Sequence, residues 1–287
     1  MAYAKINSVT NANMAKVSNV AKAAIGKISN IDAPSAGVTF ADDKSLNFDG
    51  SDDYVAIDDF EFTNENISIS WWCKRESTAS NQVMFQALND FTSDDYYKGL
   101  VLRTNSDTGI KWFFGEQSGG NYWGTNSGDI GFNSGDGWHH FVFTIGEGPT
   151  TAYTSPAMAL YMDGESVWSQ AANPSGSSIV GSAVAIKLRV GSRFNGGTQS
   201  GVFTGNINDV AFFNTVLDAD AVTVMYNSGD PTDLRVDSGD YDNSANLTGY
   251  WWFGDEDTYP TITDRTSNGN DGTMTNMAEE DIESDVP

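Results

Sequence analysis

Short stretches in which apolar residues occupy every second position most constrain how this chain folds. The sequence NISISWWCK at 66–74 places Ile67, Ile69, Trp71 and Cys73 on one side of an extended backbone. Similar alternation occurs in residues 138–145, 158–162 and 184–190. A period of two predicts strands with one buried face, and the Gly, Asn, Asp and Ser clusters between them predict turns. The pattern therefore favours an all-β sandwich.

One short helix is expected in NTVLDADAVTVMYNSG at 214–229. Asp218 is placed to cap its N-terminus, and Val222, Met225 and Tyr226 follow at helical spacing. Gly229 is the expected stop signal. The later stretch 247–277 is too short for a second core, so we expect it to return and complete a sheet of the sandwich.

Six sequence blocks occur in an order that resembles one known family. They are SLNFDGSDDYVAI (45–57), SISWWCKRE (68–76), GWHHFVFTI (137–145), LYMDGESV (160–167), LRVGSRF (188–194) and GNINDVAFFNTVLDADAVTVMYNSG (205–229). Together they resemble the laminin G-like, concanavalin A-like family. The resemblance implies a jelly-roll sandwich of two curved antiparallel sheets. It also implies glycan or protein binding, often with a calcium ion near one rim, although a minority of relatives are glycoside hydrolases.

The expected organisation has three parts. Residues 1–37 form a repetitive basic arm and linker, residues 38–230 form the laminin G-like sandwich, and residues 231–287 complete the sandwich and end in an acidic tail. Part of the last segment, LTGYWWFGDEDTYPTITDRTSNGNDGTMTNM at 247–277, also resembles a strand and exposed turn of the family.

Charge and cysteine content exclude several classes of protein. The formal net charge is −24, so the body repels nucleic acid and anionic membranes. The single cysteine, Cys73, allows no intrachain disulfide. No run approaches eighteen apolar residues, and the N-terminus lacks the apolar region of a signal peptide. We therefore expect synthesis in a cytosol, with no membrane insertion and no obvious export signal.

Catalytic residues are not evident. The two histidines, His139 and His140, are adjacent in an expected strand, so their side chains point to opposite faces and cannot enter one site. The closest acid cluster to a glycosidase motif is Asp255, Glu256 and Asp257, in an expected turn. A non-enzymatic protein is the preferred expectation, with glycoside hydrolysis through Asp255 or Asp257 as a less favoured alternative.

Two loops carry the oxygen ligands that calcium prefers. The first has Asp49, Asp52 and Asp53, and the second has Asp264, Asn268, Asn270 and Asp271. The alternative for the first loop is ordinary turn chemistry, in which Asp bonds its own backbone. Calcium is therefore a candidate cofactor at either loop.

Aromatic residues beside polar loops are candidates for stacking on sugar rings. We predict such a role for Tyr96, Tyr97, Tyr122 and Trp123. Trp112 and Phe114 lie on one face of an expected strand, and core packing is the favoured interpretation for them.

The N-terminus repeats one phrase three times at eleven-residue intervals. The repeated positions are Lys5, Ile6, Val9, Lys16, Val17, Val20, Lys27, Ile28 and Ile31. Their spacing fits helical turns, but the Asn, Ser, Gly and β-branched residues favour a disordered or marginally helical arm. Such regularity suits docking on a regular partner surface.

A basic repetitive arm before a laminin G-like sandwich resembles virion proteins of tailed bacteriophages, particularly marine ones. That resemblance implies a head-decoration or fibre-like component on the virion surface, anchored through residues 1–37 to capsid or tail proteins. It implies host adhesion through surface glycans and a homo-oligomer or other symmetric assembly. A free calcium-dependent lectin or adhesin is the alternative.

Overall fold

The computed structural model describes residues 40–62, 66–88, 99–105, 108–115, 122–146, 157–171 and 184–287. Phe40–Pro287 forms one compact unit. The repetitive arm, from Lys5 to Ile31, lies outside the described residues, as do Tyr96 and Tyr97.

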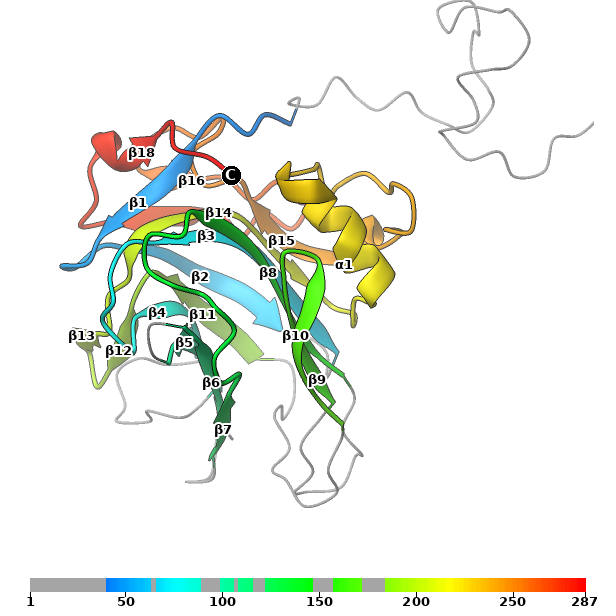
Figure 1. The fold of residues 1–287 in the computed structure, drawn as a ribbon. Coiled ribbons are helices and arrows are strands. Elements are labelled where there is room, and N and C mark those ends of the chain that lie inside the picture. The colour runs from blue at the N-terminus through cyan, green and yellow to red at the C-terminus, as the bar shows by residue number, and fades with distance from the viewer. Residues whose placement is uncertain are drawn as a thin grey trace, which may run out of the picture. The chain divides into compact units, whose positions relative to one another are not determined.

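Two antiparallel sheets make up the sandwich (Figure 1). Sheet A contains, in spatial order, β10 (Glu165–Gln170), β9 (Met158–Met162), β8 (Trp138–Ile145), β3 (Ile67–Arg75), β14 (Thr204–Phe213), β1 (Ser45–Asp49) and β18 (Ile282–Glu283), with β15 (Leu247–Trp251) also paired to β14. Sheet B contains β16 (Thr261–Ile262), β17 (Gly272–Thr275), β2 (Tyr54–Phe62), β11 (Val184–Val190), β4 (Val83–Leu88), β5 (Gly99–Thr104), β6 (Ile110–Gly115) and β7 (Tyr122–Asn126). A small hairpin, β12 (Arg193–Asn195) with β13 (Thr198–Ser200), follows β11. The all-β jelly-roll expectation is confirmed.

Aromatic side chains join the two sheets across the core. Phe60 of sheet B meets Phe212 of sheet A with ring centroids 5.0 Å apart, and Trp112 meets Phe143 at 4.9 Å. Trp112 is fully buried, as its strand alternation predicted. These edge and tilted contacts are the geometry that aromatic quadrupoles favour, and they fix one sheet over the other.

The helix α1 (Ala219–Tyr226) covers part of the outer face of sheet A, where Figure 1 draws it in yellow. Asp218 caps it by accepting a hydrogen bond from the Ala221 backbone N–H at 2.9 Å, as predicted. The helix ends at Asn227, which has the left-handed φ of 45°, rather than at Gly229. Gly229 instead closes a 3₁₀ turn, Asn227–Gly229, so the stop signal was placed two residues late.

Strand β3 is buried on both faces, which the alternation did not predict. Ile69, Trp71 and Cys73 enter the core between the sheets, as expected. Trp72, on the other face, is only 4% exposed, because Tyr226 of α1 stacks over it at 5.9 Å. A central strand under a helix loses its polar face, and only the packing of the helix decides this.

The segment after α1 joins both sheets. It enters sheet A as β15 and sheet B as β16 and β17, then returns to β1 as β18. Two further 3₁₀ turns, Ser244–Asn246 and Glu279–Asp281, lie along this path. None of the helices among the described residues has the length and apolar character that crossing a membrane requires.

Candidate functional site

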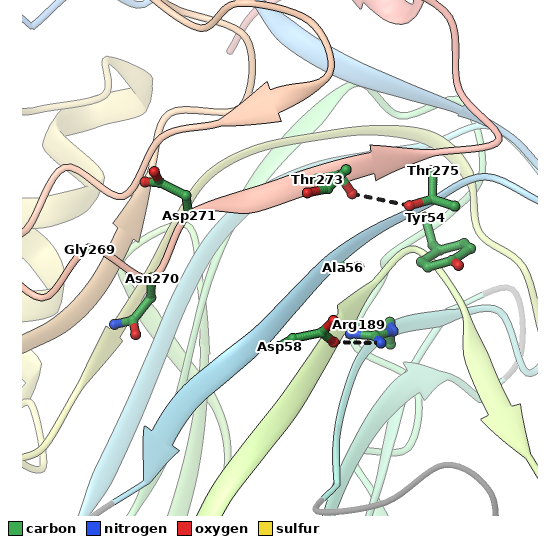
Figure 2. Close-up of a pocket in the computed structure, with 9 residues that line it drawn as sticks. All are labelled: Tyr54, Ala56, Asp58, Arg189, Gly269, Asn270, Asp271, Thr273 and Thr275. Carbon is green, nitrogen blue, oxygen red and sulfur yellow. Dashed lines mark hydrogen bonds and ion pairs between the residues drawn. The ribbon is translucent and has the colours of Figure 1, made fainter.

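A pocket lies on the outer face of sheet B, where β17, β2 and β11 run side by side (Figure 2). Register places Thr273, Ala56, Arg189 and Gln86 in one row across four strands. The residues between them along each strand, such as Val55 and Leu188, enter the core. Strand alternation therefore presents this row outward.

The pocket has a volume of about 460 Å³ and a predominantly polar lining. It is lined by Tyr54, Ala56, Asp58, Arg189, Gly269, Asn270, Asp271, Thr273 and Thr275. The Tyr54 ring is held from one side by Phe194, with ring centroids 5.0 Å apart, and the Arg189 guanidinium lies 5.9 Å from its centroid. The half-exposed Tyr54 ring is thus a fixed apolar surface beside several hydroxyl, amide and carboxylate groups.

One ion pair crosses the pocket floor. Arg189 Nη2 lies 2.7 Å from Asp58 Oδ1, and the Arg189 side chain is 11% exposed while that of Asp58 is 59% exposed. Arg189 also donates from Nη1 to the Leu188 carbonyl oxygen at 3.0 Å. The guanidinium is therefore held in place, whereas its carboxylate partner faces solvent.

Gln86 fastens the β12–β13 hairpin beside the pocket. Its side-chain amide accepts from the Phe194 N–H at 2.6 Å and donates to the Phe194 carbonyl oxygen at 3.0 Å, as a neighbouring strand would. Gln86 is fully buried, so these two bonds satisfy a polar group that would otherwise be costly to bury. Through Phe194 the same hairpin supports the Tyr54 ring.

The opposite wall comes from the loop between β16 and β17, which contains the second predicted calcium loop. The Asp264 carboxylate accepts from the backbone N–H groups of Tyr250, Thr266 and Asn270 and from the Thr266 hydroxyl. Asn268 and Asn270 both donate to the Thr248 carbonyl oxygen at 3.1 Å. These bonds shape the loop that presents Asn270 and Asp271 to the pocket, and calcium binding here stays a prediction.

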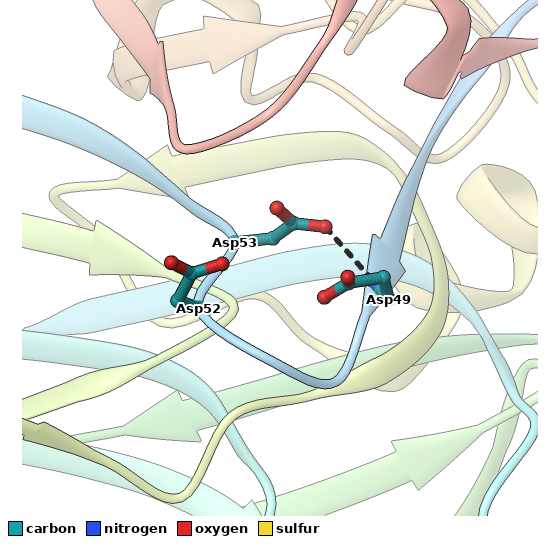
Figure 3. A group of neighbouring side chains, drawn as sticks. All are labelled: Asp49, Asp52 and Asp53. Carbon is teal, nitrogen blue, oxygen red and sulfur yellow. Dashed lines mark hydrogen bonds between the residues drawn. The ribbon is translucent and has the colours of Figure 1, made fainter.

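The first predicted calcium loop brings its three carboxylates together at the end of β1 (Figure 3). One oxygen from each of Asp49, Asp52 and Asp53 lies within 4.8 Å of the others. Asp53 Oδ2 accepts from the Asp49 N–H at 2.9 Å, so turn chemistry also operates. Burial is the largest cause that raises the Asp53 pKa, to about 6, and the neighbouring Asp49 charge adds to it. Among the described residues this is a candidate cation group, one residue before Tyr54.

Of the four aromatic residues predicted to bind sugar, the structure describes the strand pairing of Tyr122 and Trp123 but not Tyr96 and Tyr97. Tyr122 and Trp123 pair with Gly115 and Phe114 on β6, but their side chains are outside the described part of the structure, as are those of Tyr96 and Tyr97.

The sequence analysis did not single out the pocket residues Tyr54, Ala56, Asp58 and Arg189. The available signal was the outward phase of YVAID at 54–58, which sets an aromatic, a small residue and an acid on one face.

The histidines face opposite sides of β8, as predicted. His139 contacts the core ring of Phe132 and pairs with Asp163 at 2.7 Å. His140 lies under α1, where its Nε2 is 2.8 Å from the Ser70 hydroxyl. Burial lowers the pKa of His140 to about 3. Ser70 and His140 are both buried, and the His140 ring packs against Trp72 and Tyr226, so this pair is closed to solvent.

Asp255 and Asp257, the carboxylates of the glycoside hydrolase alternative, accept hydrogen bonds from nearby backbone N–H groups. Asp255 accepts from the N–H groups of Asp43 and Lys44, and Asp257 accepts from those of Gly254 and Thr263. Asp257 also pairs with Arg265 at 2.7 Å, and its side chain is fully buried. Burial raises the pKa of both carboxyls, that of Asp255 to about 6. Neither residue lines the pocket on sheet B.

The model of the concanavalin A-like lectin/glucanases superfamily matches residues 49–223, more than half of the 287 residues. The chain belongs to this superfamily. The match spans β2 to α1 and therefore includes three of the strands that support the pocket, but not β17. No curated protein matches the sequence significantly.

Solved structures share the superfamily fold at low sequence identity. A protein from Bacteroides ovatus proposed to bind carbohydrate is 14% identical, with a TM-score of 0.52 over 83% of this chain and 60% of its own length. A heptameric pentraxin from Limulus polyphemus is 12% identical, with a TM-score of 0.46; the match covers 66% of this chain and 84% of the pentraxin chain. A Ruminococcus gnavus sialidase module solved with α2,3-sialyllactose is 12% identical, with a TM-score of 0.47; the match covers 65% of this chain and 98% of the module. At these identities only the fold is shared.

Proposed function

We propose that this chain is a non-enzymatic glycan-binding protein whose site is the pocket on sheet B. The observation that carries the proposal is the side-by-side placement of a supported aromatic ring and several hydrogen-bonding groups in one cavity of about 460 Å³. Cavities of this size suit small-molecule ligands. Membership of a superfamily named for lectins and glucanases supports carbohydrate as the ligand.

The lining suits the chemistry of a sugar. A pyranose ring has an apolar C–H face that packs on an aromatic ring, while its hydroxyls exchange hydrogen bonds with carboxylates, amides and hydroxyls. Tyr54 supplies the ring, and Thr273, Thr275 and Asn270 supply polar groups from the adjacent strand and loop. Ala56 between them is small, which leaves room for a sugar over the sheet.

Replacing Tyr54 by Ala tests the site directly. We expect glycan affinity to fall roughly tenfold or more, because buried aromatic contacts dominate binding free energy. Ala56→Leu, which fills the same space without changing charge, should weaken binding similarly. Affinity is measured by calorimetry on the strongest ligand from a glycan array.

The matched control is Tyr259→Ala, since Tyr259 is 41% exposed and does not line the pocket. All variants should keep the thermal unfolding temperature within a few degrees of the parent. If Tyr54→Ala and Ala56→Leu bind as well as the control does, the pocket is not the glycan site. Oligosaccharides recovered shortened after long incubation would contradict the non-enzymatic part of the proposal.

A calcium-dependent form of the same activity is favoured by the Asp49, Asp52 and Asp53 group. Hard carboxylate oxygens within one ion's reach suit calcium, and the group directly precedes the pocket residue Tyr54. Chelation with EDTA should then weaken glycan binding, and added calcium should restore it. Asp52→Asn, which removes an exposed carboxylate, should make binding insensitive to both.

We further propose that residues 1–37 anchor the protein to capsid or tail proteins of a virion, so that the sandwich faces the host surface. Support comes from the sequence alone: three eleven-residue repeats place Lys5, Lys16 and Lys27 at equivalent positions. Equivalent positions suit a symmetric partner surface. The acidic body would then meet host glycans outside the particle.

A further inference from the structure

Basic side chains gather on the sheet face that carries the pocket, against the character of the whole chain. Residues 40–287 contain 38 Asp and Glu but only 11 Lys and Arg. Yet residues 166–208, which include β11 and the β12–β13 hairpin, contain no Asp or Glu and three basic residues, Lys187, Arg189 and Arg193. One flank of the pocket thus comes from a stretch of the sandwich without acids.

The strands of sheet B place further cations on the same face. Leu188, Leu102 and Trp112 enter the core, so their neighbours Lys187, Arg189, Arg103 and Lys111 project outward. Arg103 and Lys111 are directly opposite in register, and both lie over the Phe113 ring, at 4.7 and 5.0 Å. Among the described outward side chains of these strands and β2, four are basic, of which Arg103 is buried, and one, Asp58, is acidic; the loop wall of the pocket adds a second carboxylate, Asp271.

Arg189 joins this basic face to the pocket. It lines the cavity beneath Tyr54 and already holds one carboxylate, that of Asp58, at 2.7 Å. A planar guanidinium binds carboxylates and sulfates with the same fork of donors. Because the Asp58 side chain is 59% exposed, it can turn to solvent and leave its place on Arg189 to an anionic group of a ligand.

We infer that the pocket takes acidic glycans, meaning oligosaccharides with carboxylate or sulfate groups. This inference rests on the proposed glycan-binding function and specifies its ligand class. The sugar ring packs on Tyr54, and the anionic group of the sugar replaces Asp58 on Arg189. Lys187, two residues before Arg189 on β11, attracts the same anionic group. Asp58 competes with the ligand for Arg189, so an anionic group binds there only if it displaces the Asp58 carboxylate.

The test uses the full chain on a glycan array that contains neutral, carboxylated and sulfated oligosaccharides. We expect the strongest ligands to be acidic. Methyl-esterifying the carboxyls of the best ligand, or removing its sulfates, should weaken binding about tenfold, the effect of losing one good charged contact. Raising NaCl from 50 to 500 mM should reduce the preference, because the screening length shortens to a few ångströms.

Variants then assign the preference to named residues. Lys187→Gln should lower the ratio of acidic to neutral affinity, and Asp58→Asn should raise it. Lys44→Gln is the matched control: it removes one positive charge from the segment before β1, where Lys44 donates to Ser284, and should leave the ratio unchanged.

The two levels of the proposal fail in different ways. Strong ligands that are uncharged, or an acidic preference that Lys187→Gln and Asp58→Asn do not alter, would overturn the ligand class while glycan binding stands. An array with no ligand of any class would overturn glycan binding itself, and the ligand class with it.

Discussion

At the scale of single residues, the most unusual groups are three neighbouring aspartates, Asp42, Asp209 and Asp255. Asp42 accepts from the Asn208 amide at 2.7 Å, and Asp209 accepts from the Tyr250 hydroxyl at 3.3 Å. Burial is the largest cause that raises the pKa of both carboxyls; the Asp255 charge is the next cause that raises the pKa of Asp42, to about 7, and the Asp42 charge is the next cause that raises that of Asp209. The charged forms of these carboxyls are therefore destabilised in the folded protein.

Asp42→Asn should stabilise the protein at neutral and higher pH. A folded-state pKa raised above the usual 4 means that the folded protein binds this proton more tightly than the unfolded chain does. The free energy of unfolding therefore falls as pH rises from about 4 to about 7, and it stays low above that. We expect the variant to gain on the order of 1 kcal/mol at pH 8, allowing for solvent screening, and little at pH 4.

Urea denaturation of both proteins at pH 4, 6 and 8 gives the measurement. The exposed Asp240→Asn is the control, because it makes the same change of charge away from the cluster. A difference between Asp42→Asn and parent that does not grow with pH would show that Asp42 is not strained by burial.

At the scale of elements, α1 depends on one cap. The Asp218 side chain satisfies a backbone N–H in the first turn, and the apolar face of the helix packs through Val222 and Met225 on the outer face of sheet A. Asp218→Ala should lower the free energy of unfolding by about 1 kcal/mol, the usual effect of losing a cap. Asp220→Ala removes a first-turn acid that is not the cap, and should cost less. Equal losses in chemical denaturation would contradict the capping role.

Element prediction succeeded where the local pattern was complete. Asp-Gly is a common sequence signal for a two-residue hairpin turn, and the Asp163-Gly164 pair between β9 and β10 has the positive φ at both positions, 53° and 81°, that such a turn requires. The stop at Gly229 was misplaced because Asn227 already adopts the left-handed conformation, and Asn tolerates it almost as glycine does.

At the scale of the whole molecule, arm and sandwich have opposite charge. The first 31 residues hold four lysines and no acid, whereas the whole chain has a net charge of −24. If the arm is an anchor, deleting residues 1–31 should abolish incorporation into virus particles while the sandwich keeps its cooperative unfolding. Protein blots of purified particles carry the measurement. Normal amounts of the truncated protein in particles would contradict anchoring by the arm.

The sequence by itself determined the class of fold and the identity of most strands. Alternation set the core face of β3, β8 and β9 through residues such as Ile69, Phe141 and Leu160, because a period of two has only one way to bury its apolar side. It also indicated the Asp49, Asp52 and Asp53 group, whose members are close along the chain and therefore close in space.

The pocket was decided only by the tertiary structure. Tyr54, Arg189 and Thr273 are far apart in sequence and meet because β2 pairs with β11 on one side and β17 on the other. Local alternation says which side chains point outward, but not which strands become neighbours. The return of residues 247–277 to the sandwich was expected from the sequence, but its pairing of β17 with β2 was decided by the fold.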